Sequence, residues 1–162
     1  MNSRIKLHED QDTLILIKPD GMRRGLTGLI LDRFLKAGMR LRGSKILRLT
    51  HDEAAGFYKV HEKKSFYSDL ISFMTSGPVA VFVLRGERAV ERVRSVMGKT
   101  DPAEAHPGTV RHDFGVSRSY NTVHGPDSIE NAEREIPFFF KETDLLPLES
   151  MLNISDWYSE GD

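Results

Sequence analysis

The chain has 162 residues, 39% of them apolar, and no linker-like tract divides it, which predicts one domain (1–162) with a full hydrophobic core. Its formal net charge of −1 gives no overall attraction to nucleic acid or to anionic membranes, so any anion site must be local. The lack of cysteine excludes disulfides and thiolate metal sites, and it fits a reducing compartment. The longest apolar run, Val79 to Leu84, is too short to span a membrane, and the N-terminus has no signal-peptide pattern. Together these features predict a cytoplasmic protein without a membrane span.

The first predicted element is a strand over Asp12 to Lys18, a dense apolar run that Pro19-Asp20-Gly21 closes as a turn. Lys18 therefore falls at the end of a buried strand. Its side chain either reaches solvent or supplies a fixed positive charge to a phosphate group, and the strand pattern alone does not distinguish the two.

A helix and a second strand are predicted next. Apolar residues from Leu26 to Ala37 recur every three to four positions, and Gly38 is a typical helix stop. The alternation that begins at Met39 predicts a strand to about Leu49 with one solvated face. We place Arg40, Arg42 and Arg48 on that solvated face rather than in a binding patch.

Two short helices should then form a hairpin. Thr50 to Glu53 has the capping-box pattern, in which two side chains satisfy free backbone donors at a helix start, so a helix is expected through Tyr58. A second helix from Phe66 to Met74 ends at Thr75-Ser76-Gly77-Pro78.

A buried strand, a helix and a loop complete the middle of the chain. Val79 to Leu84 is a continuous apolar run, which indicates a central strand buried on both faces. Ala89 to Met97 has helical periodicity and stops near Gly98. From Thr100 to Phe114 neither periodicity is present, so we expect an ordered surface loop of the kind that often carries function.

A single histidine stands where a strand is expected to give way to a helix. Arg118 to Val123 has the β-branched content of a short strand, and Ile129 to Ile136 has helical spacing. His124 lies between them, and Asp127 or Ser128 can cap the helix. The imidazole is either a nucleophile or a side chain that fills the loop, and the local sequence leaves both interpretations open.

The order of these elements reduces to βαββαβ, with the hairpin and the loop as insertions. This order predicts an α+β sandwich, in which helices lie on one face of a four-stranded antiparallel sheet. The core should span about residues 12–140, followed by a C-terminal extension over 141–162.

Four motifs occur together in a specific order and spacing. They are Lys18-Pro19-Asp20-Gly21, Arg94 with Gly98-x-Thr100-x-Pro102, Pro107-Gly108-Thr109-x-Arg111, and Asn121-x-x-His124-Gly125-x-Asp127-Ser128. With these motifs the chain resembles the nucleoside diphosphate kinases over roughly residues 12 to 140. The resemblance implies a ferredoxin-like fold and a ping-pong exchange that maintains nucleoside triphosphate pools, in which His124 takes the γ-phosphate of a nucleoside triphosphate and gives it to a nucleoside diphosphate.

The resemblance also implies the nucleotide contacts. Asn121 and Lys18 should contact the ribose hydroxyls. Mg²⁺ should arrive with the nucleotide, held by phosphates and water rather than by protein ligands, because this ion prefers such partners to an all-protein cage. The β- and γ-phosphates should be held by Lys18, Arg94, Thr100 and Arg111.

Around the histidine, the resemblance places Tyr58 beside the imidazole and the phosphate, and Glu135 where it orients the ring. Phe66 should stack on the base, a contact that tolerates any base. Arg118 either flanks the base from the other side or points outward. A neutral imidazole suits this chemistry, because its unperturbed pKa of about 6.5 leaves it a good nucleophile near neutral pH.

Some positions depart from the family pattern or lie outside it. Pro126 replaces the serine that usually follows His-Gly, and we expect it in the first turn of the helix with reduced activity at most. Pro137 should kink or end that helix. We assign the remaining histidines to the surface: His8, His51, His61, His106 and His112.

The ends of the chain bear on assembly. The segment Asp156 to Glu160 resembles the ending of hexameric family members, and Pro102 lies in the loop that those members use around the threefold axis. We therefore favour a homo-hexamer, with a dimer or tetramer as alternatives.

Two rival functions remain. One is an inactive nucleotide-binding relative. The other is a nucleic-acid-binding protein, for which the near-neutral charge is poor support and which would use Arg40, Arg42, Lys45 and Arg48. No specific nucleic-acid partner is expected.

Overall fold

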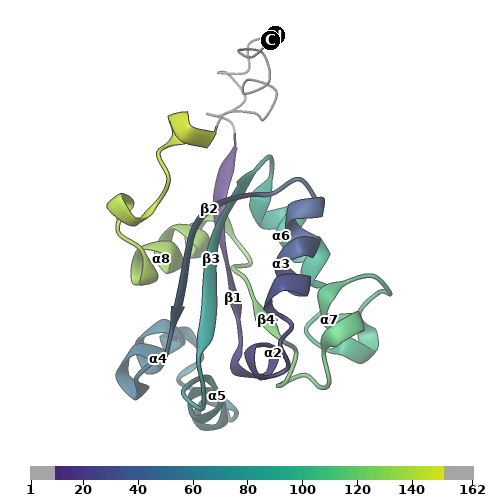
Figure 1. Ribbon diagram of the computed structural model, residues 1–162. Helices are drawn as coiled ribbons and strands as arrows, with labels where there is room; N and C mark the ends of the chain where they lie inside the picture. Colours follow the sequence, from purple (N-terminus) through teal and green to yellow (C-terminus); the bar gives the residue numbers. More distant parts are fainter. Residues whose placement is uncertain (1–9, 152–162) are drawn as a thin grey trace, which may run out of the picture.

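The computed structural model describes residues 10–151. Four strands form one sheet in the order β2-β3-β1-β4, and each neighbouring pair is antiparallel (Figure 1). This order confirms the predicted four-stranded antiparallel sheet and the central place of the apolar strand that starts at Val79. The strands are β1 (Gln11–Ile17), β2 (Arg40–Leu47), β3 (Val79–Gly86) and β4 (Val123–His124).

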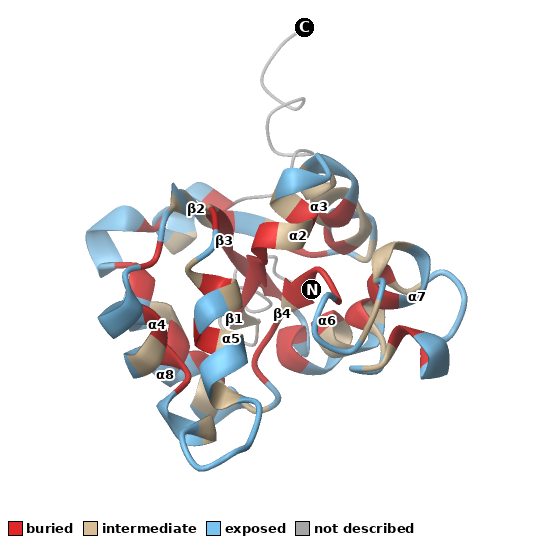
Figure 2. Cartoon of the chain, turned by 90° about the horizontal axis from the view of Figure 1, so that it is seen from below, coloured by how far each residue is buried: buried red, intermediate tan, exposed pale blue. Residues whose placement is uncertain are grey.

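Helices cover both faces of this sheet, which corrects the prediction of helices on one face. Because side chains alternate along a strand, Leu14 and Leu16 enter one core while Ile15 and Ile17 enter the other. The two central strands are accordingly buried on both sides, as Figure 2 shows in red. The crossover helices α3 (Thr27–Lys36) and α6 (Ala89–Met97) pack on one face, and α4 (His51–Phe57), α5 (Tyr67–Met74) and α8 (Ile129–Phe139) pack on the other.

The predicted helical hairpin is present as α4, a short 3-10 turn (η1, Lys59–His61) and α5. The capping box is confirmed, since the Thr50 hydroxyl accepts from the Glu53 N–H while the Glu53 carboxylate accepts from the Thr50 N–H. The hairpin places Phe57 and Tyr58 in the core, where the rings of both contact the ring of His124.

Two short helices replace predicted turns and loops. α2 (Pro19–Arg23) occupies the expected turn after β1, with proline in its first turn. α7 (Val110–Phe114) lies inside the expected loop, where the Thr109 hydroxyl accepts from the His112 N–H at its start. Each helix has only five residues. Such a length is too short for a helical repeat to become visible in a sequence.

The segment around the histidine differs from its prediction in detail. β4 contains only Val123 and His124, because the chain before it turns at Thr122, whose φ is +70°. Ser128 is the N-cap of α8, so Pro126 precedes the helix rather than forming its first turn. Pro137 lies inside α8, which continues to Phe139; so close to the helix end, the proline removes only one of the last backbone hydrogen bonds.

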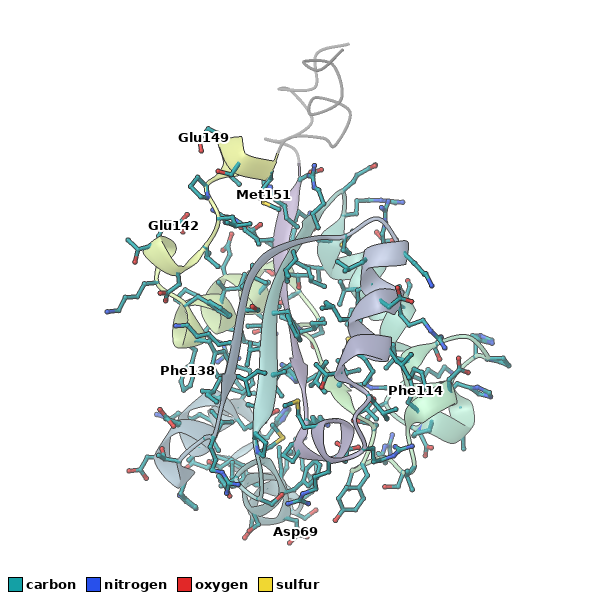
Figure 3. The ribbon with its side chains drawn as sticks, viewed as in Figure 1. Asp69, Phe114, Phe138, Glu142, Glu149 and Met151 are labelled. Carbon is teal, nitrogen blue, oxygen red and sulfur yellow. The ribbon has the colours of Figure 1, made fainter. Side chains whose placement is uncertain are left out.

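Arg42 is buried, which corrects its assignment to a solvated face. Its guanidinium pairs with Asp12 and with Glu142 of the C-terminal extension. Asp12 also pairs with Arg85. The extension continues along β2, where the Leu146 N–H donates to the Arg42 carbonyl, and its short turns lie beside the sheet in Figure 3. These turns are η3 (Glu142–Asp144) and η4 (Leu148–Met151).

Leu145 of the extension packs against the core of the same chain. The predicted tail contact of Asp156 to Glu160 lies outside the described residues. Within residues 10–151, no helix has the length and apolar character that a membrane crossing requires.

Candidate active site

The site lies where the end of β1 meets the start of the antiparallel strand β4. Leu16 of β1 is paired with His124, and Lys18 follows the last residue of β1, where its N–H donates to the Thr122 carbonyl at 2.8 Å. This register brings the predicted lysine and the predicted histidine to the same end of the sheet, although they are far apart in the sequence.

The His124 ring is held from two sides. Its Nε2 lies 2.6 Å from Oε1 of Glu135, a carboxylate that α8 presents from the interior with 3% exposure. The rings of Phe57 and Tyr58 approach it edge-on, with centroids at 5.2 and 5.7 Å. Because a carboxylate keeps a proton on the nitrogen that it contacts, Nδ1 is the nitrogen left with a lone pair.

The surroundings favour the neutral imidazole. Burial lowers the pKa of His124 below its ordinary value of 6.5, and the positive charges of Lys18 and Arg111 add to that effect. The Glu135 carboxylate opposes it but does not reverse the direction. At neutral pH the ring is therefore uncharged and suited to act as a nucleophile.

The cations Lys18 and Arg111 lie near this histidine, and Arg94 lies near Arg111, where its guanidinium donates to the Gly125 carbonyl at 3.5 Å. The Arg111 guanidinium donates to the carbonyls of Gly98 at 3.2 Å and Val123 at 2.9 Å. Burial and the nearby Arg94 lower the pKa of Arg111 to about 10, and burial and Arg111 lower that of Lys18 to about 8. Positive charges that depress each other's pKa form a region in which an anion would be strongly stabilised.

Asn121 connects Lys18, Thr100 and Arg118 through hydrogen bonds of its side chain. Its Oδ1 accepts from Lys18 Nζ at 2.7 Å, and its Nδ2 donates to the carbonyls of Thr100 at 2.8 Å and Arg118 at 2.9 Å. Thr100 and Arg118 thus reach the site through their main chains, while their side chains are exposed.

A series of rings leads from the histidine to the surface. Tyr58 is buried, and its hydroxyl finds no hydrogen-bond partner among residues 10–151. The His61 ring stacks on it with centroids 6.3 Å apart and is 5.8 Å from Phe66, which is 50% exposed. His61 is therefore half-buried between two predicted site residues rather than purely a surface side chain.

Two residues near the site were missed by the sequence analysis in this role. Phe57 contacts the histidine ring, and Asp20 accepts a hydrogen bond from the Thr122 N–H at 3.1 Å. Both had a signal in the sequence: Phe57 precedes Tyr58, and Asp20 belongs to the motif that begins at Lys18, where we interpreted it only as a turn residue.

Acidic side chains within residues 10–151 do not form a metal cage. In the described part of the chain, no group of three or more histidine, aspartate and glutamate side chains is placed to hold a metal ion. The predominance of cations at the site suits the binding of phosphate oxygens rather than of a bare metal ion.

Comparisons with known proteins identify one family along most of the chain. The sequence model of a family described as nucleoside diphosphate kinase matches residues 11–145. A nucleoside diphosphate kinase of Nitratiruptor sp. is 50% identical over 134 residues, which cover 83% of this chain and 98% of that protein. One from Rhodospirillum centenum is 53% identical over 134 residues, covering 83% of this chain and 96% of that protein.

Solved structures are similar in fold as well as sequence. The nucleoside diphosphate kinase of Halobacterium salinarum in complex with CDP superposes with a TM-score of 0.85 at 37% identity, covering 94% of this chain and 99% of that chain. The enzyme of Aquifex aeolicus gives a TM-score of 0.83 at 41% identity, covering 85% of this chain and 99% of that chain.

Proposed function

The chain belongs to the nucleoside diphosphate kinase family, and from this premise we propose that His124 carries the phosphate that the enzyme moves between nucleotides. The reaction is a ping-pong transfer of the γ-phosphate from a nucleoside triphosphate to a nucleoside diphosphate, which maintains nucleoside triphosphate pools. The observation that supports His124 most directly is its 2.6 Å contact with the buried carboxylate of Glu135, beside the cations Lys18 and Arg111.

The first half of the reaction forms a phosphohistidine. The lone pair on Nδ1 of His124 attacks the γ-phosphorus, the bond from that phosphorus to the β,γ-bridging oxygen breaks, and the nucleoside diphosphate leaves. The imidazole becomes cationic as the N–P bond forms, and the Glu135 carboxylate stabilises that charge through Nε2–H. The second half reverses these steps on a different nucleoside diphosphate.

Phosphoryl transfer passes through a loose transition state with charge on the equatorial oxygens, so positioning and electrostatics provide most of the catalysis. We assign Lys18, Arg94 and Arg111 to those oxygens, together with the Thr100 hydroxyl. The unpartnered Tyr58 hydroxyl beside the ring is available as a further donor. Mg²⁺ bound to the phosphates and water would neutralise part of their charge.

The rest of the nucleotide would extend outward along the ring series. Lys18 and Asn121 are assigned to the ribose hydroxyls, and the half-exposed Phe66 to the base, with Arg118 on its other side. Stacking reads no hydrogen-bonding edge of the base. ATP, GTP, CTP and UTP should therefore all serve as donors, and a preference on the order of several thousandfold for one base would reveal a missed polar contact.

Incubation of the protein with γ-labelled ATP and Mg²⁺ tests the assignment of His124. We expect acid-labile, alkali-stable phosphate on the wild-type protein and on a His106→Ala control, whose histidine is exposed. His124→Ala should bind nucleotide but take up no label. Normal labelling or turnover of His124→Ala would refute the assignment.

We also propose a cytoplasmic homo-oligomer, with a hexamer favoured over a dimer or tetramer. The absence of cysteine fits a reducing compartment. β2 is an edge strand that the extension contacts at Arg42, but its Ile46 is 71% exposed, so this strand still has apolar surface to bury. Light scattering of the intact chain and of a chain truncated after Ser150 tests both the state and the role of the tail. An unchanged mass after truncation would exclude the tail as a determinant of assembly.

A further inference from the structure

The backbone immediately before the histidine is strained. Thr122 has φ = +70°, a value that β-branched residues rarely adopt, and its side chain is fully buried. The Val123 N–H donates to the Asn121 carbonyl at 2.9 Å, which closes a three-residue γ-turn with Thr122 at its centre. A γ-turn with a positive central φ is rare, and such conformations persist only where surrounding contacts hold them.

Contacts from the first strand and helix hold this turn. The Asp20 carboxylate accepts from the Thr122 N–H at 3.1 Å, and the Lys18 N–H donates to the Thr122 carbonyl at 2.8 Å. Both polar groups of the strained residue therefore bond to the segment that follows β1. Among residues 10–151, the threonine hydroxyl bonds only locally, to the Asn121 carbonyl at 2.7 Å.

The packing beneath the turn leaves little freedom. A Cβ atom at Gly21 would lie 2.9 Å from Ile17 Cγ2 and 3.3 Å from the Thr122 carbonyl oxygen, so α2 approaches the turn as closely as a glycine permits. The second carboxylate oxygen of Asp20 is buried without a hydrogen-bond partner among residues 10–151. A carboxylate oxygen buried without a partner costs stability, and Asp20 carries this cost while its other oxygen accepts from the Thr122 N–H.

We propose that Asp20 is a positioning residue for phosphoryl transfer, which acts by holding Thr122 in the γ-turn. The turn separates Asn121, whose side chain bonds Lys18, from His124, whose ring must meet the phosphorus. If the turn relaxed, these two groups would change direction relative to each other. Asp20 itself contacts neither nucleotide nor phosphate in this proposal, which rests on the proposed function of His124.

A different role for Asp20 would be purely electrostatic, since its negative charge counteracts part of the lowering of the Lys18 pKa. The two roles make different predictions for Asp20→Asn, which loses the charge but keeps an oxygen that can accept from the Thr122 N–H. Asp20→Ala loses both. A hydrogen-bonding role makes the alanine variant much worse than the asparagine variant, whereas a charge role makes them alike.

Thr122→Gly provides the decisive background, because glycine adopts a positive φ without strain. In the wild-type background, Asp20→Ala should lower kcat by about 30-fold while KM for ATP changes by less than about threefold, as expected for a misdirected nucleophile. In the Thr122→Gly background, the same substitution should lower kcat by only about threefold, since no strained conformation then needs to be held. Asp52→Ala, at a fully exposed aspartate, is the matched control.

A measurement independent of catalysis accompanies the kinetics. In ¹H–¹⁵N spectra, Asp20→Ala should shift the amide signals of Thr122 and Val123 strongly, and Asp20→Asn should shift them less. Melting temperatures measured on the same variants separate misdirection from general loss of stability, because an unfolding variant loses binding and turnover together.

The inference is overturned if Asp20→Ala retains kcat within twofold of wild type, if Asp20→Asn is as impaired as Asp20→Ala, or if the loss is the same in both Thr122 backgrounds. Its failure is distinct from that of the proposed function. If wild-type protein forms no phosphohistidine on His124, the function itself is wrong; if wild type is labelled and the Asp20 variants behave like it, only the positioning role is wrong.

Discussion

Replacing Glu135 by glutamine tests how the protein activates its histidine. The wild-type contact joins Oε1 of a carboxylate with 3% exposure to Nε2 of His124 at 2.6 Å. Glutamine preserves the shape and an accepting oxygen but removes the charge. A hydrogen bond to a charged group contributes about 1.5–3 kcal/mol and a neutral one about 0.5–1.5 kcal/mol. The loss of about 1–2 kcal/mol as the imidazolium forms corresponds to roughly 5–30-fold in the rate of phosphorylation.

The same substitution should slow phosphorylation at neutral pH but extend the pH range of the reaction to more acidic conditions. The neutral ring is the nucleophile, so the rate is lost as pH falls through the pKa of His124, which burial already holds below 6.5. Glu135 raises that pKa, so Glu135→Gln should lower it further and move the acid limb of the rate profile to lower pH. The variant should therefore have a slower plateau that persists to more acidic conditions.

Single-turnover labelling with ATP from about pH 5 to 8 measures both effects. Glu133→Gln, on the exposed side of the same helix, is the matched control and should behave as wild type. Phosphorylation of Glu135→Gln within twofold of wild type, or an acid limb that moves to higher pH, would show that the carboxylate does not stabilise the imidazolium.

Three further predictions concern the phosphates, the base and the C-terminal extension. The pKa of Lys18 is about 8 in the free protein, so KM for ATP should rise as pH passes about 8, and a KM that stays flat to pH 9 would contradict phosphate binding by its ammonium. Phe66→Ala should raise KM for all four nucleoside triphosphates by roughly 5–150-fold, from about 1–3 kcal/mol of stacking, while Phe66→Trp should retain binding; an effect on one base alone would disprove simple stacking. Arg42→Ala leaves the partly buried Asp12 with one partner fewer and should lower the free energy of unfolding in urea by about 3 kcal/mol, whereas exposed Arg48→Ala should change it little.

The features that the sequence predicted well are those set by local patterns. The capping box from Thr50 to Glu53, the buried strand from Val79 and the histidine between a strand and a helix each depend on residues only a few positions apart. A period of two or of about 3.6 residues is readable over such distances, and capping residues mark where it begins.

The features that it missed depend on contacts across long stretches of chain. Arg42 looked like a solvated strand residue because its partners Asp12 and Glu142 are 30 and 100 positions away. We predicted helices on only one face of the sheet, because the βαββαβ order does not show on which face an inserted helix packs. Thr122 has ordinary β-branched character, and only the tertiary bonds that hold it reveal a turn where a strand was expected.

Phosphate binding and histidine activation place opposite electrostatic requirements on the site, and the arrangement of the charged residues meets both. The proposed phosphate site depends on the cations Lys18 and Arg111, yet the same charges disfavour the imidazolium that His124 would become on attacking the phosphorus. Glu135 lies on the side of the ring away from Nδ1, so its charge stabilises the imidazolium through Nε2 without occupying the face where the phosphate must enter. Since Glu135 comes from α8 while Lys18 follows β1, the sheet and one helix separate the negative partner from the positive ones, and the histidine between them responds to both.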